Sequence, residues 1–226
     1  MSSRAGQTRA LIYNGGHGHP FAETTAALSD LLAARGAAVA VETDFQACVG
    51  RLEAADLLVV NALRWTMTQH EKYAPFRAAL AYRPPPGLMD RLTGWVAAGG
   101  RLMAMHTAVI CFDTEPGWLD LLGGGWRWGV SHHPPLGPLR IQRVGERAGG
   151  ACFDLVDEAY HHLALAPDAV VRATCALDEG PQPVAWTRAW GAGQVAVDTL
   201  GHDRRSLETP DHAQLIGDLL DGLTAP

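Results

Sequence analysis

Apolar runs with the composition of buried strands alternate with amphipathic segments in the first half of the chain, and this alternation limits the fold more than any other feature. The strand-like runs are Arg9–Asn14, Ala38–Val41, Leu57–Val60 and Arg101–Met105. Segments 21–35 and 88–98 place apolar residues at helical spacing, and glycine follows each of them. Strands that are apolar on both faces are typical of a parallel sheet covered by helices on both sides. The sequence therefore predicts an α/β fold with a parallel sheet at its centre.

Beyond about residue 123 the strand candidates become shorter and turns lie between them. They are Leu139–Arg143, Val170–Cys175, Val184–Thr187 and Gln194–Thr199, and we expect them to add antiparallel strands to the sheet. The chain closes with a predicted helix whose N-cap is Thr209 and whose first residue is Pro210. A chain of 226 residues with 47% hydrophobic residues can bury one core, so we expect a single domain over residues 1–226.

Charge and cysteine content argue against several classes of protein. The net charge is −6 and the 18 lysines and arginines form no basic cluster, so no nucleic-acid partner is expected. The four cysteines form no Cys-x-x-Cys pair, which is typical of a protein kept in a reducing compartment. No apolar run approaches the ~20 residues of a membrane helix, and residues 1–7 carry no apolar leader. We therefore expect a cytoplasmic protein that does not enter a membrane.

His106 occupies an unusual position at the end of the strand Arg101–Met105. The run Ala104-Met105-His106-Thr107-Ala108 has the small-x-nucleophile-x-small layout of a strand-to-helix elbow, a sharp turn that presents one side chain to a cleft. Acyl-transfer enzymes carry Ser or Cys at such a position, whereas an imidazole suggests a metal ligand, an acid/base group or a polar anchor. Cys111 lies too far beyond the elbow to be its nucleophile, and we expect it to behave as a buried apolar side chain.

Polar residues follow several predicted strands at the sheet edge where open parallel sheets bind ligands. They are His17 and His19 after the first strand, Asn61, Arg64 and Trp65 after the third, His106 after the fourth, and His202 after the strand Gln194–Thr199. His19 is favoured over His17 because Pro20 restrains the backbone directly after it. The alternative for this first loop is a plain glycine turn with a histidine that caps the following helix.

Two further segments offer histidines near the predicted site. In His132-His133 the prolines that follow force extended backbone, so at most one of the two imidazoles faces the site, and a solvated loop is the alternative. In segment 157–162, a helix would place Glu158 on one face with His161 and His162, whereas an extended chain would pair Glu158 with Tyr160. A polar surface turn is the third alternative for the histidines of this segment.

Taken in order, these motifs resemble the ThuA-like (trehalose utilisation) family, which has a class I glutamine amidotransferase-like fold of flavodoxin type. The resemblance rests on Gly15-Gly16-x-Gly18-His19, Trp65-Thr66-Met67, Gly99-Gly100…Met105-His106, Gly124-Gly125-Trp126…His132, Asp157-Glu158-x-Tyr160, Pro183-Val184-Ala185-Trp186-x-Arg188-x-Trp190-Gly191 and Leu200-Gly201-His202, and it spans nearly the whole chain. It implies a cytoplasmic protein of disaccharide or keto-sugar catabolism that lacks the amidotransferase Cys-His-Glu triad. It also implies site roles for His19, His106, His132, Glu158 and His202.

One departure from the family pattern concerns the stretch Val144–Gly150, which lacks the His-Pro-Ile type segment that family members carry before the Glu-x-Tyr motif. We expect a trimmed substrate-facing loop there, which also bears on the class of sugar that the protein accepts.

Two functions are consistent with these residues. The first is an enzyme that acts on a sugar or a sugar-derived carbonyl compound with a divalent metal such as zinc or manganese. Its expected metal ligands are His19, His106, His132 and His202, and its expected substrate contacts are Arg64, Trp65, Trp126 and Tyr160. Without a metal, His106 would act as general base and Glu158 as its partner acid.

The second function is a non-catalytic module that binds a sugar or a protein partner on a degenerate amidotransferase-like fold. A plain binding cleft does not need several imidazoles on separate strand ends, so the histidines favour the enzyme. Hydrolysis of glutamine is disfavoured because the elbow has no thiol. Whether the chain forms a homo-oligomer stays open.

Overall fold

The computed structural model describes residues 7–145 and 151–223, and in this part of the chain one long mixed sheet carries the fold. Its strand order is β2-β1-β3-β4-β11-β10-β9-β6-β7. The strands are β1 (Arg9–Gly16), β2 (Ala38–Glu42), β3 (Leu57–Leu63), β4 (Arg101–Met105), β6 (Gly137–Arg143), β7 (Cys152–Asp157), β9 (Val170–Cys175), β10 (Gln182–Trp190) and β11 (Gly193–Asp198). A separate short ribbon pairs β5 (Gly124–Gly125) with β8 (Ala164–Leu165).

The half of the sheet from β2 to β11 is parallel and confirms the predicted fold class. Strands β2, β1, β3, β4 and β11 pair in register as neighbours that run in one direction. With β11 as the fifth parallel strand, this is the order of a flavodoxin-like sheet, in which the direction of winding reverses between β1 and β3. The carboxyl ends of all these strands therefore meet at one edge of the sheet.

The remaining strands β10, β9, β6 and β7 alternate in direction, as expected for the second half of the chain. Strand β7 is absent from the expected elements, although its residues alternate between exposed and buried positions. Its last residue is Asp157, so this strand brings Glu158 toward the edge where the parallel strands end.

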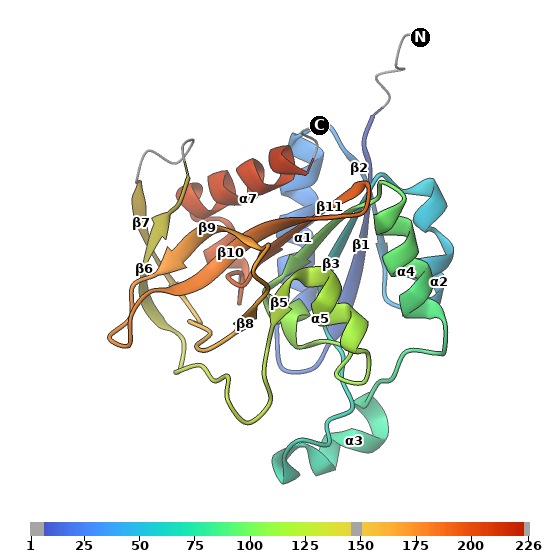
Figure 1. Cartoon of the computed structure of the whole chain (residues 1–226), viewed down its shortest axis with the longest axis horizontal. Helices are drawn as coiled ribbons and strands as arrows, with labels where there is room; N and C mark the ends of the chain where they lie inside the picture. Colours follow the sequence, from blue (N-terminus) through green and yellow to red (C-terminus); the bar gives the residue numbers. More distant parts are fainter. Residues whose placement is uncertain (1–6, 146–150, 224–226) are drawn as a thin grey trace.

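Helices cover both faces of the sheet (Figure 1). α1 (Phe21–Ala34) and α7 (Pro210–Gly222) pack on one face, and α2 (Phe45–Gly50), α4 (Leu88–Ala97) and α5 (Pro116–Leu122) pack on the other. The short helices α2, α3 (Ala74–Leu80), α5 and α6 (Arg204–Leu207) were not among the expected elements, because so few turns do not reveal a hydrophobic period. α3 lies apart from the sheet in Figure 1 and buries none of its residues.

Each face of the sheet has its own hydrophobic core. Ile12 of β1 packs with Leu28 and Ile216 from the two helices on one side. Leu11, the preceding residue of the same strand, packs on the other side with Leu92 and Trp118. This division follows from the alternation of side chains along a strand, and it explains why the parallel strands are apolar at almost every position.

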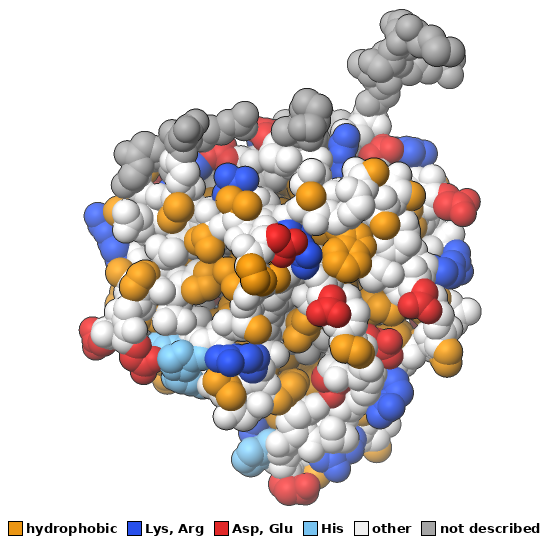
Figure 2. Space-filling model, viewed as in Figure 1, with side chains coloured by type: hydrophobic (Ala, Val, Ile, Leu, Met, Phe, Trp, Pro, Cys, Tyr) orange, Lys and Arg blue, Asp and Glu red, His pale blue; other side chains and the backbone are white. Residues whose placement is uncertain are grey.

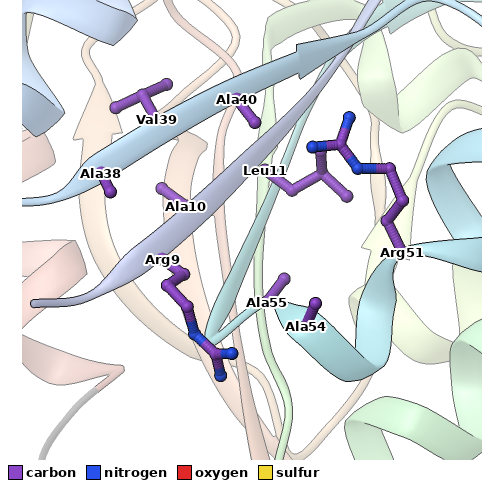
Figure 3. A pocket seen from close by; sticks show the side chains of 9 residues that line it. All are labelled: Arg9, Ala10, Leu11, Ala38, Val39, Ala40, Arg51, Ala54 and Ala55. Carbon is purple, nitrogen blue, oxygen red and sulfur yellow. The ribbon is translucent and has the colours of Figure 1, made fainter. Parts of the chain in front are cut away.

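The surface drawn in Figure 2 mixes acidic, basic and hydrophobic side chains. Among the helices that the structure describes, none combines the length and the apolar content needed to cross a membrane. A cavity of about 240 Å³ lies at the amino-terminal end of β1, between Arg9, Arg51 and the short side chains of β2 and residues 54–55 (Figure 3). None of the predicted site residues lines it, because they follow the opposite ends of the strands.

Candidate metal-binding and catalytic site

The predicted elbow is present at His106. Met105 ends β4 in extended backbone, and a 3-10 helix, His106–Ile110, begins directly after it. His106 has a φ of 47°, in the left-handed region that costs a residue with a Cβ about 1–2 kcal/mol. Ala104 and Ala108 on either side are fully buried, so only small side chains fit around the turn. The strained backbone turns the imidazole away from the strand direction and toward the end of the sheet.

Two hydrogen bonds define the state of the His106 ring. Its Nδ1 lies 2.8 Å from the carbonyl oxygen of Thr199. Because a carbonyl can only accept, Nδ1 carries a hydrogen, and in the neutral ring Nε2 then offers a lone pair. The hydroxyl of Tyr160 lies 3.2 Å from this Nε2 and can donate to it when the ring is neutral. Burial raises the pKa of Tyr160 well above its usual value, so the phenol keeps its proton.

The His106 ring belongs to a histidine–carboxylate cluster that also contains His19, Glu158 and His202. These side chains come from the ends of four strands: His19 follows β1, His106 follows β4, Glu158 follows β7 and His202 follows β11. Glu158 is at the centre. Its Oε2 lies 3.5 Å from His106 Nε2 and 3.8 Å from His19 Nε2, and its Oε1 lies 3.3 Å from His202 Nδ1.

The protonation states around Glu158 follow from competition between burial and charge. Burial alone would raise the pKa of Glu158, but the imidazoles of His106, His19 and His202 outweigh it and hold that pKa far below its ordinary value. The carboxyl group is therefore ionised. Burial lowers the pKa of His19 despite the nearby carboxylate, which favours a neutral ring with a free lone pair. The hydrogen bond to Glu158 raises the pKa of His202, which is more exposed to solvent.

Three polar atoms in this cluster are buried without a hydrogen-bond partner: His19 Nε2, Glu158 Oε2 and His202 Nδ1. Buried polar groups in folded proteins are nearly always paired, so unpaired groups that face one another call for a reason. Tetrahedral coordination at bond lengths of about 2.0–2.1 Å places donor atoms about 3.3 Å apart. The separations of 3.3–3.8 Å around Glu158 are close to this spacing and longer than ordinary hydrogen bonds. The cluster therefore fits a divalent metal ion.

Asp157 positions the cluster, a role that the sequence motifs do not predict. Its buried carboxylate accepts hydrogen bonds from the backbone N–H groups of Glu158 and Gly201, both at 2.7 Å, and from that of His202 at 3.3 Å. The hydroxyl of Ser206 also donates to it. Asp157 thus ties the end of β7 to the loop after β11, and so sets Glu158 relative to His202. A carboxylate next to a site residue at a strand end is the signal that could have identified it.

The expectation that His132 belongs to this site is not met, because its neighbour takes that place. His133 Nδ1 lies 3.6 Å from Glu158 Oε1, whereas His132 groups with His161 and Glu179. The extended backbone before the prolines does direct the two rings apart, as expected. The prediction chose the wrong member of the pair, because the spacing of the prolines does not reveal which face of the segment points inward.

The other predicted contact residues divide into two groups. Tyr160 stacks on His106 at a centroid distance of 5.1 Å, and Trp126 lies 5.4 Å from Tyr160 and 6.1 Å from His133, so both border the cluster. Trp65 is only 2% exposed and packs with Phe21, Leu63 and Met67, which leaves little of the ring for a ligand.

Arg64, His17 and Cys111 also lie away from the cluster. The guanidinium of Arg64 is turned toward Gly15 and the phenol of Tyr13. His17 packs against Phe76. Cys111 is buried, and burial raises the pKa of its thiol to about 12, in keeping with the apolar role expected of it. Of the stretch Val144–Gly150, where the departure from the family pattern occurs, residues 146–150 lie outside the described residues.

Comparisons with known proteins agree with this fold. Residues 9–218 match the family described as ThuA, trehalose utilisation. The chain belongs to the ThuA family. The description of the family supports a carbohydrate-related role. A comparison with curated proteins finds no match.

Solved structures share the ThuA fold over nearly the whole chain. A Parabacteroides merdae protein described as ThuA-like has 16% identity and a TM-score of 0.75, with 97% of this chain and 89% of that chain covered. A Salmonella typhimurium protein described as cytoplasmic has 13% identity and a TM-score of 0.63, with 96% and 98% covered. A β-galactosidase from Rahnella sp. R3 has 18% identity and a TM-score of 0.62, and the match covers 99% of this chain but 32% of that one. At these identities the likeness concerns the fold.

Proposed function

We propose that this ThuA protein is a metal-assisted enzyme that acts on a sugar or a sugar-derived carbonyl compound. The observation that carries the proposal is the set of unpaired buried atoms His19 Nε2, Glu158 Oε2 and His202 Nδ1, which face one another at the carboxyl edge of the sheet. A protein that only binds its ligand could pair these three atoms with ordinary hydrogen-bond partners and still recognise that ligand. A catalytic metal site instead uses three protein ligands and keeps one position open for substrate or water.

In this proposal His19, Glu158 and His202 hold the ion. When bound, a zinc or manganese ion would polarise a substrate oxygen or lower the pKa of a water molecule. The lowered pKa of Glu158 supports an anionic ligand rather than the proton donor that a metal-free site would need. His133 faces Oε1 of the same carboxylate, the oxygen nearest to His202, and is more exposed, so it is placed to orient Glu158 or to contact substrate.

His106 takes a different role because its ring is already engaged. The carbonyl of Thr199 fixes the tautomer of the neutral ring, and the hydroxyl of Tyr160 lies within hydrogen-bond distance of the remaining nitrogen. A substrate hydroxyl that displaced the phenol from this nitrogen would meet a neutral base at hydrogen-bond distance, as general-base catalysis requires. Tyr160 would then be free to donate to a substrate oxygen.

A sugar-type substrate is supported by the aromatic side chain beside the cluster. Trp126 is partly buried and borders the cluster beside Tyr160, and an indole at this place suits stacking on the apolar face of a sugar ring. We also place the protein in the cytoplasm, which is supported by the description of the Salmonella neighbour.

Metal content and turnover, measured on the same variants, test the proposal. Protein purified without chelator is analysed for zinc and manganese, and turnover is measured on a panel of disaccharides and keto-sugars. His19→Ala is expected to lose one metal equivalent and all metal-dependent turnover. His106→Ala is expected to keep the metal while kcat falls by about 10²–10⁴-fold, the usual contribution of a general base.

His70→Ala is the matched control, because His70 is exposed and lies on the segment before α3, away from the cluster. Folded wild-type protein that binds neither metal at the cluster would overturn the metal site. Loss of the metal from His106→Ala as well as His19→Ala would overturn the separate role of His106. Sugar binding without any turnover would favour the non-catalytic module.

A further inference from the structure

A second group of histidines lies outside the site described above. It consists of His132, His161 and Glu179, with His162 beside them, and we refer to these residues as the outer histidine cluster. The ligand atoms of the first three lie within 4.8 Å of one another. Nothing in the proposed reaction uses these side chains, and they come from three separate segments of the chain.

Both nitrogen donors nearest to Glu179 converge on one carboxylate oxygen. His162 Nε2 lies 3.0 Å and His161 Nδ1 lies 3.5 Å from Glu179 Oε2. These separations lie on either side of the ~3.3 Å spacing of donor atoms around a tetrahedral ion. The ring of His132 stacks on that of His161 at a centroid distance of 4.7 Å and lies 5.5 Å from the ring of His162. Three imidazoles therefore surround one carboxylate.

An unusual backbone conformation makes this convergence possible. Neighbouring side chains in an extended chain point in opposite directions, so His161 and His162 would not normally reach one carboxylate. His162 has a φ of 55°, a left-handed conformation that is uncommon for a residue with a Cβ. The bend turns the second imidazole back toward Glu179. Such strain persists only where the surrounding structure holds it, and it is often found at functional sites.

The backbone around these residues is held by hydrogen bonds that do not involve the imidazoles, while the His132 Nδ1 lies 3.5 Å from the carbonyl oxygen of Val130. The N–H of His161 donates to the carbonyl of His132 at 2.8 Å. The N–H of His162 donates to Gln182 Oε1 at 3.0 Å, and its carbonyl accepts from Ser131 Oγ at 3.0 Å and from Arg127 Nε at 3.1 Å. The segments that carry the donors are thus arranged before any ligand binds, which reduces the entropic cost of binding.

We propose that the outer histidine cluster binds a divalent transition metal through His132, His161 and Glu179, with His162 beside them as the candidate fourth ligand. Three imidazoles and one carboxylate form a donor set that suits Zn²⁺, Ni²⁺ or Cu²⁺ rather than Mg²⁺ or Ca²⁺, which prefer oxygen ligands. With His162 as the fourth ligand, the number and types of donors would match those of tetrahedral structural sites. The ion would cross-link the segment 131–133, the turn after β7 and the turn between β9 and β10.

Such a cross-link would also reach the first site. His132 and His133 are consecutive, and their rings face the two clusters on opposite sides of one extended segment. An ion bound by His132 would hold the backbone of His133, and with it the imidazole beside Glu158. The outer site would then act as a structural support for one wall of the candidate active site.

The test uses a background in which the first cluster is disabled, so that failure of one site is not mistaken for failure of the other. The variant His19→Ala with His202→Ala is freed of metal and titrated with Zn²⁺ by calorimetry, and with Co²⁺ by visible absorption. We expect binding of one equivalent of Zn²⁺ and the intense absorption of four-coordinate Co²⁺. Adding His161→Ala and His162→Ala should weaken Zn²⁺ binding by roughly 100-fold or more, because two ligands are lost.

Adding His70→Ala to the same background is the matched control, and it should leave the affinity for Zn²⁺ unchanged. Circular dichroism establishes that each variant is folded. A more conservative change, Glu179→Gln, should weaken Zn²⁺ binding while leaving the histidines in place. If the folded background variant does not bind Zn²⁺, the proposal is overturned, and the outer histidine cluster is only a set of ion pairs between its histidines and Glu179. Binding that survives the loss of both His161 and His162 would overturn it equally.

Discussion

At the scale of single residues, the site depends on where backbone geometry sends each side chain. His106 could be located from the sequence because small residues on both sides of a strand end are typical of an elbow. The choice between His132 and His133 could not be made in the same way. Both precede prolines in extended backbone, and only the pairing of residue 132 with residue 161 decides which ring faces Glu158.

Asp157→Asn tests the positioning of the cluster. Every partner of this carboxylate is a hydrogen-bond donor. In asparagine an NH₂ group replaces one of the oxygens, and it cannot accept a hydrogen bond from the N–H or O–H group that it faces. We expect a loss of about 2–3 kcal/mol in the free energy of unfolding, together with weaker zinc binding at the cluster. Denaturant unfolding and calorimetry measure the two effects.

The control for this variant lies on the same strand. Asp154 pairs with Arg140 at the surface, where Asp154 is 70% exposed. Asp154→Asn should therefore change stability by less than about 1 kcal/mol and leave zinc binding unchanged. A purely structural role of Asp157 would lower stability without changing the affinity for metal in the folded protein.

At the scale of secondary-structure elements, sequence reasoning succeeded where the pattern was long. The apolar parallel strands and the helices α1, α4 and α7 each carry enough residues for their period to show. The four-residue helix α6 does not, and it is held by Asp203, whose side chain accepts from the N–H of Ser206. The run Cys152–Asp157 alternates between exposed and buried positions, which is a strand signal, yet the expected elements include only the motif that follows it.

Helix α7 is tethered to the sheet by a buried ion pair that predicts a pH dependence of stability. His212 Nε2 lies 3.0 Å from Asp198 Oδ2, and its Nδ1 lies 2.9 Å from the carbonyl of Ser206. Both nitrogens face acceptors, so the ring is held as an imidazolium. Burial alone would lower the pKa of His212, but Asp198 outweighs it and raises that pKa above 6.5.

Because the pKa is raised in the folded state, the stabilisation is complete below the unfolded-state pKa and is lost as pH rises through the folded-state pKa. His212→Gln should cost about 3–5 kcal/mol of unfolding free energy at about pH 5.5 and less at about pH 9. Denaturant unfolding at several pH values measures the difference from wild type. A difference that grows with pH would show that His212 is buried in its neutral form.

At the scale of the whole molecule, the order of the strands explains why residues far apart in sequence form one cluster. Strands β1, β4 and β11 end at one edge of the sheet, and the antiparallel half returns β7 so that Glu158 reaches the same edge. The parallel half and its histidines could be predicted from buried-strand patterns and the rule for open sheets. The path of the antiparallel strands could not, because strand pairing across long loops leaves no local trace in the sequence.

Removal of metal should destabilise the whole domain, because the ligands of the cluster join both halves of the sheet. An ion present at 100 times its Kd stabilises the folded state by about 2.7 kcal/mol. For a domain of this size that corresponds to a rise in Tm of roughly 5–10 °C. Thermal unfolding of chelator-treated protein, with and without added zinc, measures it. Adding zinc to the chelator-treated variant His19→Ala/Glu158→Gln should raise its Tm by less. Equal increases in Tm in both proteins would contradict a stabilising ion at this cluster.

The most direct measurement is a crystal structure of protein grown with zinc, with diffraction data collected on both sides of the zinc absorption edge. Our account predicts an anomalous peak within about 2.0–2.2 Å of His19 Nε2, His202 Nδ1 and a carboxylate oxygen of Glu158. The hydroxyl of Tyr160 should still lie within hydrogen-bond distance of His106 Nε2 in that structure. Absence of a peak there, with the three donor atoms paired instead to water or to one another, would contradict the central claim that these strand ends form a metal centre.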